Sequence, residues 1–273
     1  MKQKEILSYF NLEAHPFDKE IKTDALMELP TIEDAGDKLD LLIETKGIGL
    51  LTGPSGCGKS ALIRKTAANL NPGLYKAFYI SHTSLGTAEF YQSFAAALGL
   101  SPQGRRSTVF RRIKDFILSS NDQKRIHPVI FIDEAHSLSS DTLKEIRMLT
   151  NFEYDSKNAC TIVLIGHSEL RQKLSLNVFS SLTNSITYSI RISALSAEET
   201  YSYLEGRVSS NGGSPALFTK NSMKLIHDIS GGILRITENV GWQSLIKAFQ
   251  YASANWTYHL DVLKMQSIQS LEI

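Results

Sequence analysis

The stretch GPSGCGKS, residues 53–60, lies between an apolar run and a helical pattern. It matches G-x-x-x-x-G-K-[ST] at every fixed position, in the strand–loop–helix context that this pattern requires. Its glycines allow backbone N–H groups to point inward around phosphate oxygens, and the following helix adds the positive end of its dipole. The stretch therefore predicts a strand, a phosphate-binding loop and a helix in succession, and a site for a nucleoside triphosphate.

The side chains of this loop have separate expected tasks. The Lys59 ammonium group reaches the β- and γ-phosphates, and the Ser60 hydroxyl coordinates Mg²⁺. We therefore expect ATP and Mg²⁺ as cofactors. The residues expected to contact the nucleotide are Gly53, Pro54, Ser55, Gly56, Cys57, Gly58, Lys59, Ser60, Ala61 and Arg235.

A second motif, HPVIFIDEAHSL at residues 127–138, is an apolar strand that ends in two acids. Asp133 is placed to hold Mg²⁺ through water. Glu134 is placed to orient or deprotonate the water that attacks the γ-phosphate. An acidic pair can also simply cap a helix, but downstream of a phosphate loop it indicates ATP hydrolysis.

Two further positions are candidates for reading the state of the nucleotide. His167 ends the apolar strand of TIVLIGHSEL, and it lies close to Asp133 and Glu134 if the two strands are neighbours. The alternative is an ordinary loop histidine. Arg235 follows Gly232 at the start of a C-terminal helix, where it can swing onto the β- and γ-phosphates. The alternative is an exposed arginine on a solvated helix.

The rest of the chain predicts an α/β fold with a small helical domain at the C-terminal end. Continuous apolar strands separated by helices are typical of a parallel sheet covered on both faces. The expected strands are 47–51, 76–80, 129–132, 161–165 and 186–192, with helices from Lys59, Ala88, Thr108, Asp141 and Ser168. Helical patterns follow from Ser196 and near 219–229, 234–253 and 261–269. The expected domains are 1–194, with an N-terminal segment 1–46, and 195–273.

Composition limits the possible partners and the cellular location of the protein. The 273 residues are 42% hydrophobic and carry a net charge of +1, so any nucleic-acid contact must come from a local patch. The two cysteines, Cys57 and Cys160, are far apart and have no metal-ligand spacing. No apolar run reaches the ~20 residues of a membrane span, and the N-terminus has no signal-peptide pattern. We expect a cytoplasmic protein with no membrane partner.

The motifs occur in an order that resembles the ExeA/GspA-type AAA+ ATPases. The shared elements are F-x-x-x-x-x-P-F (Phe10, Pro16 and Phe17), GPSGCGKS, VIFIDEAHSL, MLTNFE, IVLIGHSEL and G-x-x-R. The resemblance implies an AAA+ fold, in which an αβα P-loop nucleotide-binding domain carries a small all-helical lid. It also implies assembly into a ring or a helical filament.

One position departs from that family. Relatives have Gln-Arg-Ile at the entry to the fifth strand, and the arginine serves a neighbouring subunit as a finger. Here the residues are Asn184, Ser185 and Ile186. We therefore expect slow hydrolysis, or a replacement arginine, for which Arg171 and Arg191 are the nearest candidates.

Relatives with this nucleotide domain include secretion proteins and transposition helpers. The secretion proteins continue into a transmembrane helix and a peptidoglycan-binding domain, which this sequence lacks, and its length therefore favours the helpers. These resemble the TnsC, MuB, TniB and IstB regulators, which bind duplex DNA as ATP-dependent oligomers and recruit a transposase. The alternatives are a secretion-type ATPase and a helicase-loader-like protein that remodels DNA.

A basic segment supports the interpretation as a DNA-binding transposition helper. Residues 101–125 carry seven Lys or Arg residues against two acids, a net charge of +5. The expected DNA contacts are Arg105, Arg106, Arg111 and Arg112, near a helix start at which Ser107 and Thr108 are candidate caps. No base-reading motif accompanies them, so we expect binding that is largely independent of sequence and steeply dependent on salt. The alternative is a solvated basic helix face.

Overall fold

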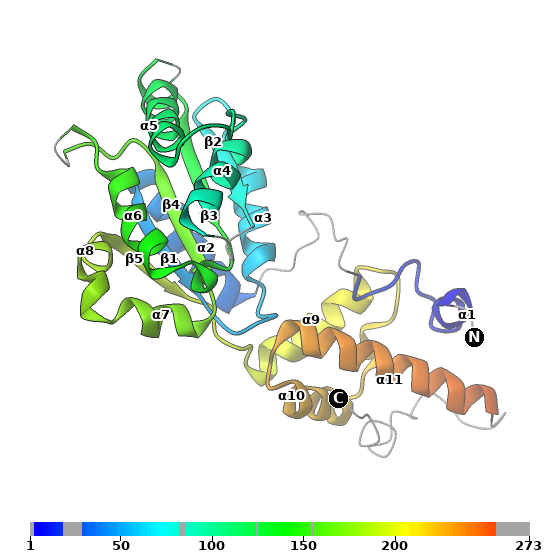
Figure 1. The fold of residues 1–273 in the computed structure, drawn as a ribbon. Helices are drawn as coiled ribbons and strands as arrows, with labels where there is room; N and C mark the ends of the chain where they lie inside the picture. The colour runs from blue at the N-terminus through cyan, green and yellow to red at the C-terminus, as the bar shows by residue number, and fades with distance from the viewer. Residues whose placement is uncertain (1–2, 19–28, 82–85, 124, 154–155, 255–273) are drawn as a thin grey trace. The chain divides into compact units, whose positions relative to one another are not determined.

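A computed structural model describes residues 3–18, 29–81, 86–123, 125–153 and 156–254 (Figure 1). Its contacts divide the chain into two compact units. The sheet unit comprises Asp34–Pro54 and Lys59–Ile192. The helical unit comprises Met1–Glu33, Ser55–Gly58 and Ser193–Ile273. The helical unit thus includes the four middle residues of the phosphate loop, Ser55–Gly58.

The sheet unit is built on five parallel strands in the order β2-β3-β4-β1-β5. In register, Ile132 at the end of β3 lies opposite Leu164 of β4, so these two strands end side by side. The strands are β1 Gly47–Thr52, β2 Tyr75–Ile80, β3 His127–Ile132, β4 Thr161–Gly166 and β5 Ile186–Arg191. The predicted α/β fold with a parallel sheet is confirmed, and each predicted strand is present within two residues.

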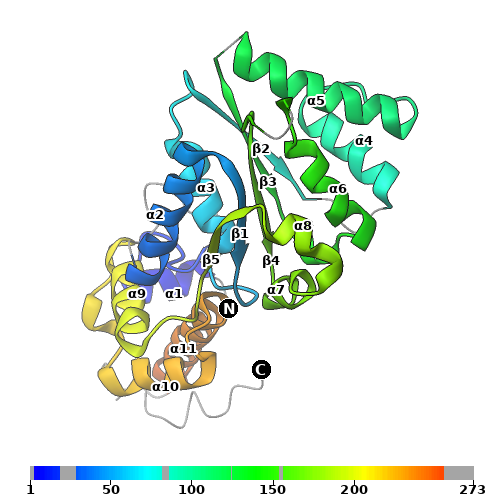
Figure 2. The ribbon, with the colours of Figure 1, turned by 90° about the vertical axis from the view of Figure 1, so that its left-hand side faces the viewer.

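Helices cover both faces of this sheet (Figure 2). One face carries α2 (Pro30–Thr45) and α3 (Lys59–Asn69), and the other carries α4, α5 and α6. Strands β1, β3 and β4 are buried along their whole length, and most of their residues are apolar on both faces. The remaining helices of this unit are α4 Thr87–Ala97, α5 Arg106–Asp122, α6 Ser140–Thr150, α7 Ser168–Leu174 and α8 Ser180–Thr183.

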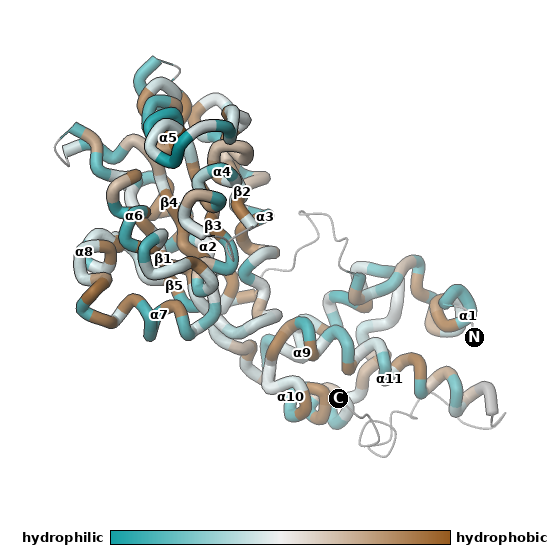
Figure 3. The backbone as a smooth tube through the Cα atoms, viewed as in Figure 1, coloured by the Kyte–Doolittle hydropathy of each residue, from teal (hydrophilic) through white to brown (hydrophobic). Residues whose placement is uncertain are grey.

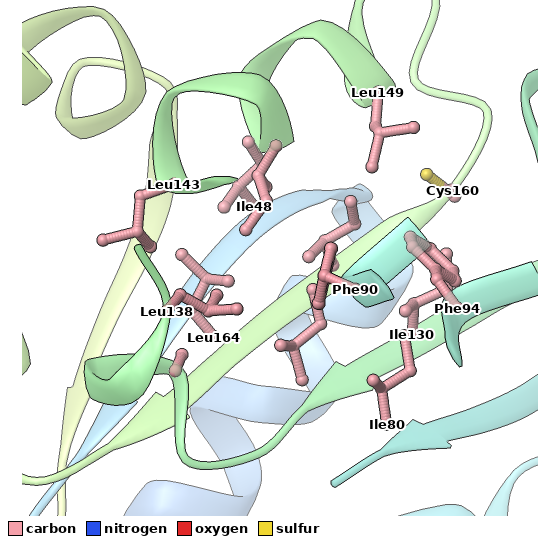
Figure 4. Packing of buried hydrophobic residues seen from close by; sticks show 14 of the residues in the cluster. Ile48, Ile80, Phe90, Phe94, Ile130, Leu138, Leu143, Leu149, Cys160 and Leu164 are labelled. Carbon is pink, nitrogen blue, oxygen red and sulfur yellow. The ribbon is translucent and has the colours of Figure 1, made fainter. Parts of the chain in front are cut away.

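The core of the sheet unit lies beneath α4 and α6. Phe90 and Phe94 of α4 pack toward Ile130 and Leu164 of the central strands (Figure 4). On α5, buried residues recur once per turn between charged ones, so the helix has one hydrophobic face and its tube changes repeatedly between the hydrophobic and hydrophilic colours (Figure 3). Helix α2 was not among the predicted helices. It packs closely on β1, where a Cβ added at Gly49 would lie 2.1 Å from Leu42 Cδ2.

The helical unit contains α1 (Gln3–Tyr9) and three longer helices after residue 196. Phe10 and Phe17, from the N-terminal motif, are buried in one cluster with Val208 and Leu245. Arg207 Nε donates a hydrogen bond of 2.6 Å to the Pro16 carbonyl. The start of the chain therefore packs with the C-terminal helices, whereas the sequence division grouped residues 1–46 with the nucleotide-binding domain. Those three helices are α9 Ala197–Ser209, α10 Lys220–Ser230 and α11 Leu234–Ala254.

The helix boundaries of this unit follow sequence signals. Ser196 caps α9 by accepting the Glu199 N–H at 3.2 Å, and Glu199 Oε2 accepts the Ser196 N–H at 2.9 Å. This reciprocal capping box is what a serine followed three residues later by glutamate predicts. The predicted helices near 219–229 and 234–253 are present, and the one near 261–269 lies outside the described residues. Within the described ranges, no helix combines the length and apolar character that a membrane crossing requires.

Burial of His127 at the start of β3 makes stability depend on pH. Burial is the larger cause and nearby Lys46 the smaller, and together they lower the pKa of His127 from 6.5 to about 4. The unfolded chain therefore takes up a proton between about pH 6.5 and 4 that the folded chain does not. The contribution of His127 to the free energy of unfolding is therefore fully present above pH 6.5. It falls by up to about 3 kcal/mol as the pH is lowered toward 4.

We expect His127→Gln to remove this pH dependence, because glutamine does not titrate. Urea unfolding of wild type and variant at several pH values between 4 and 7 measures it. The stability of the wild type relative to the variant should fall as the pH falls. A difference that stays constant across this range would contradict the assignment.

Candidate nucleotide site

The phosphate loop joins β1 to α3 and holds its lysine in a buried position. Lys59 is 7% exposed and is the first residue of α3. Its Nζ donates hydrogen bonds to the carbonyls of Gly53 at 2.8 Å and Pro54 at 2.7 Å. A buried ammonium group needs oxygen partners of this kind. We expect phosphate oxygens to take the place of these carbonyls when a nucleotide binds.

The middle of the loop is fixed by its glycines and by helix α11. Gly56 and Gly58 have φ angles of +78° and +101°, which side chains rarely adopt. The Arg235 N–H donates a 3.1 Å hydrogen bond to the Gly56 carbonyl. A Cβ at Gly56 would lie 2.7 Å from Arg235 Cβ. The backbone at the start of α11 is therefore joined to the loop, while the Arg235 side chain is exposed.

Strand β3 leads directly to the two acids. Asp133 is 6% exposed, and its Oδ1 accepts the Glu134 N–H at 2.8 Å. Its Oδ2 accepts a short hydrogen bond from the Tyr79 hydroxyl of neighbouring strand β2. Burial, with the Asp133 carboxylate, raises the pKa of Tyr79, which keeps it a hydrogen-bond donor. Tyr79 thus orients the carboxylate that we expect to hold Mg²⁺ through water.

Tyr79 was missed by the sequence interpretation. Its partnership with Asp133 depends on β2 lying beside β3, in a register that places Tyr79 opposite Phe131. A tyrosine one residue before the end of a strand is the only local signal. The contact with Asp133 can be predicted only when the order of the strands in the sheet is known.

A carboxylate and two imidazoles meet beyond these strand ends. Glu134 has a left-handed backbone, with φ of +52°, and its Oε2 lies 3.3 Å from His136 Nε2 and 3.6 Å from His167 Nε2. The two rings have centroids 4.5 Å apart. Because β3 and β4 are neighbours, His167 lies next to Glu134, as expected. Its sensing role stays a prediction, and His136 was not anticipated.

The residues assigned to Mg²⁺ fit that ion chemically. Ser60 is exposed in the first turn of α3, and Asp133 directly follows β3 in the same unit. A hydroxyl and a carboxylate are hard oxygen donors of the kind that Mg²⁺ prefers. When bound, the ion would neutralise charge on the β- and γ-phosphates.

The two candidates for a replacement arginine finger differ in their contacts. Arg171 Nη1 donates to Ser189 Oγ at 2.8 Å and Nη2 to Thr52 Oγ1 at 3.0 Å, so Arg171 is held against the ends of β1 and β5. Arg191 is exposed at the end of β5. Ser185 Oγ donates to the Ser181 carbonyl at 2.8 Å, a local bond at the end of α8. Arg191 is therefore the better-placed candidate, and its role stays a proposal.

The four arginines assigned to DNA are all exposed at the start of α5. Arg106 Nη1 forms a 2.9 Å ion pair with Glu145, and Arg112 Nη1 donates to the Gln103 carbonyl at 2.6 Å. The helix begins after Arg105, so the expectation that Ser107 or Thr108 caps it is wrong. Two of the four arginines thus already have partners within the protein.

Comparison with known proteins defines the class. Residues 42–174 match the family model described as AAA domain. This range includes the loop, strands β1 to β4 and the acidic pair. The protein therefore contains an AAA domain, has the AAA+ fold and is an ATPase.

One curated protein is similar to this chain in sequence. The chain is 30% identical over 209 residues to General secretion pathway protein A of Aeromonas hydrophila. The match covers 76% of this chain but only 38% of that protein, so the chain spans well under half of its relative's length.

Solved structures share the fold at low sequence identity. Cdc6p from Pyrobaculum aerophilum aligns with a TM-score of 0.65 at 17% identity, over 90% of this chain and 67% of that one. The ORC1 protein of Aeropyrum pernix, solved in complex with DNA, aligns with a TM-score of 0.66 at 18% identity, over 93% and 67%. At these identities the likeness shows the fold alone.

If Arg235 reads the γ-phosphate, Arg235→Ala should weaken binding of an ATP analogue more than binding of ADP. The substitution removes the guanidinium group but keeps the backbone N–H that bonds to Gly56. A lost charge-assisted hydrogen bond of about 1.5–3 kcal/mol corresponds to roughly 10–100-fold. Equilibrium titration with both nucleotides measures the effect, with Lys247→Ala of the same helix as control. Equal weakening for both nucleotides would reduce Arg235 to a structural residue.

Proposed function

We propose that this protein is an ATP-driven switch of the General secretion pathway protein A type. ATP binding and hydrolysis at the phosphate loop change the conformation of the helical unit. The hydrogen bond between the Gly56 carbonyl and the Arg235 N–H carries this proposal, since it joins the nucleotide loop to the first turn of α11. The 30% identity to the secretion protein supports this type of role.

In the proposed cycle, Lys59 exchanges its two carbonyl partners for phosphate oxygens when ATP binds. Asp133, oriented by Tyr79, and Ser60 would hold Mg²⁺. The Glu134 carboxylate then accepts a proton from the water that attacks the γ-phosphate. Release of phosphate removes the groups that the loop surrounds. The loop backbone then changes its conformation, and the hydrogen bond at Gly56 moves the first turn of α11 with it.

We also propose that the active form is a homo-oligomer, a ring or a helical filament. In such an assembly Arg191 completes the site of a neighbouring subunit, and its position away from the family's usual one makes hydrolysis slow. This assignment accounts for an exposed arginine at the end of β5.

Hydrogen–deuterium exchange tests the switch. We expect amides at residues 233–240 to exchange at different rates with a non-hydrolysable ATP analogue and with ADP, because the first turn of α11 bonds to the loop. Helix α6 of the sheet unit, which has no described bond to the loop or to α11, is the internal control. Identical exchange at 233–240 in both nucleotide states, with both nucleotides shown to bind, would contradict the proposal.

A second candidate function is ATP-dependent binding of duplex DNA, either as a transposition helper that recruits a transposase or as a helicase-loader-like protein. The observation in its favour is the exposed basic start of α5, where the side chains of Arg105 and Arg111 have no hydrogen-bond or ion-pair partner among the described residues. Two arginines per subunit make few phosphate contacts, so oligomerisation would have to multiply them.

Reversing Arg105 and Arg111 to glutamate should strongly weaken DNA binding if this candidate is right. These two are preferred over Arg106 and Arg112, whose replacement would also break contacts within the protein. We expect at least about tenfold weaker binding at ~100 mM salt. The decrease of affinity with rising salt concentration should also be shallower. Fluorescence anisotropy with duplex DNA, with and without the ATP analogue, measures it.

The matched control reverses two exposed lysines of α10, Lys220 and Lys224. The DNA-binding candidate is supported if the wild type binds DNA, the α5 reversals remove this binding and the α10 reversals leave it intact. No ATP-dependent binding by the wild type, or equal binding by both double variants, excludes it and leaves the secretion-type switch.

A further inference from the structure

We propose that Glu134, His136 and His167 form a site for a divalent transition-metal cation such as Zn²⁺, and that occupancy of this site arrests ATP hydrolysis. One ligand atom from each residue, two imidazole nitrogens and a carboxylate oxygen, can be chosen so that all lie within 4.8 Å of one another. The binding part stands on this geometry alone. The arrest rests on the proposed function of Glu134 as the base.

The distances suit a tetrahedral ion. Nitrogen and oxygen ligands lie about 2.0–2.2 Å from Zn²⁺, so two of them on a tetrahedron are about 3.4 Å apart. Glu134 Oε2 lies 3.3 Å from His136 Nε2 and 3.6 Å from His167 Nε2. The carboxylate therefore already has the spacing to both imidazoles that a shared cation needs.

The backbone around the three ligands is constrained. Glu134 has a left-handed backbone conformation and directly precedes the short turn Ala135–Ser137, which contains His136. His167 lies directly before α7, at the end of the neighbouring strand. A Cβ at Gly166 would lie 3.3 Å from both the backbone nitrogen and Nδ1 of His136, so the two histidine segments are closely packed. Small side-chain rotations suffice to bring the ligands around an ion.

The donor set distinguishes this site from the Mg²⁺ site. Two imidazoles and one carboxylate are characteristic of zinc sites that keep a fourth position open for water, whereas Mg²⁺ prefers oxygen ligands. The side chains are accessible from solvent, with exposures of 48% for Glu134, 19% for His136 and 30% for His167. A cation can therefore enter without unfolding.

The support around the ligands limits the affinity. His136 Nδ1 is buried and has no hydrogen-bond partner among the described residues. Metal-bound histidines usually donate this second N–H to a carboxylate or carbonyl, and loss of such a partner costs about 10–100-fold in affinity. We expect a reversible site, suited to regulation, and not a permanent structural metal.

A bound cation would take the carboxylate lone pair that Glu134 needs as a base. It would not occupy Lys59, Ser60 or Asp133, which we expect to bind Mg²⁺ and ATP as before. The cation-bound protein should therefore resemble Glu134→Gln, with ATP retained but not hydrolysed.

Isothermal titration of the nucleotide-free full chain with ZnCl₂, in excess MgCl₂, tests the binding. We expect about one equivalent bound by the wild type, and at least tenfold weaker binding by His136→Gln and by His167→Gln. The control is His227→Gln, which removes a histidine of the helical unit whose Nδ1 bonds to Thr200 Oγ1. Thermal unfolding of each variant checks the fold, and asparagine replaces glutamine if a variant melts early.

No binding by the wild type, or equal binding by all folded variants, would overturn the site. The second readout is phosphate release with and without ZnCl₂. Inhibition of the wild type that His136→Gln relieves supports arrest, and zinc binding without inhibition overturns it. Because the titration uses no nucleotide, a failure of Glu134 as the base would leave the binding result intact, so the two failures are distinguishable.

Discussion

Replacing Glu134 with glutamine is expected to leave ATP bound and unhydrolysed. The amide has the shape of the carboxylate but cannot accept a proton from the attacking water. General-base catalysis contributes typically 10²–10⁴-fold, so phosphate release should fall by about that factor. ATP affinity should change little, because Lys59 and the loop are untouched. Steady-state phosphate release and equilibrium ATP binding measure the two properties separately.

The matched control for this change is Glu169→Gln, an exposed acid two residues beyond His167. It removes a charge near the same strand end without touching the attacking water. We expect its phosphate release to stay close to that of the wild type. If both variants lost activity equally, the effect would be one of local charge and not of a specific base.

Replacing Lys59 with alanine should abolish ATP binding. The substitution removes the ammonium group that bridges Gly53 and Pro54 in this structure and that we expect to bridge the phosphates in the complex. Two charge-assisted hydrogen bonds at about 1.5–3 kcal/mol each correspond to at least about 100-fold in affinity. Titration with a fluorescent ATP analogue measures the loss.

Lys65→Ala on the same helix α3 is the control for this change, since it removes the same charge two turns further along. ATP affinity close to that of the wild type is expected for Lys65→Ala. If Lys59→Ala bound ATP as tightly as the wild type, the nucleotide would have to bind elsewhere.

Much of the sheet unit could be predicted because its signals are local. The apolar runs that became β3 and β4 are continuous, as strands buried on both faces must be. Gly56 and Gly58 reveal the loop because their backbone angles exclude most side chains. The glycines, Lys59 and the acidic pair were therefore readable one motif at a time.

What could not be predicted depends on contacts between distant segments. Tyr79 reaches Asp133 only because β2 lies beside β3, and His136 meets His167 only because β4 lies on the other side of β3. Phe10 and Phe17 pack with helices nearly 200 residues away. None of these pairings leaves a periodicity or a spacing in the sequence.

The central claim is that one site binds ATP through Lys59 and hydrolyses it through Glu134. Single-turnover hydrolysis of γ-labelled ATP, with bound and free label measured together for wild type, Glu134→Gln and Lys59→Ala, tests it most directly. The account predicts label released by the wild type, label bound but uncleaved on Glu134→Gln, and no bound label on Lys59→Ala. Release of labelled phosphate by Glu134→Gln at the wild-type rate would contradict it.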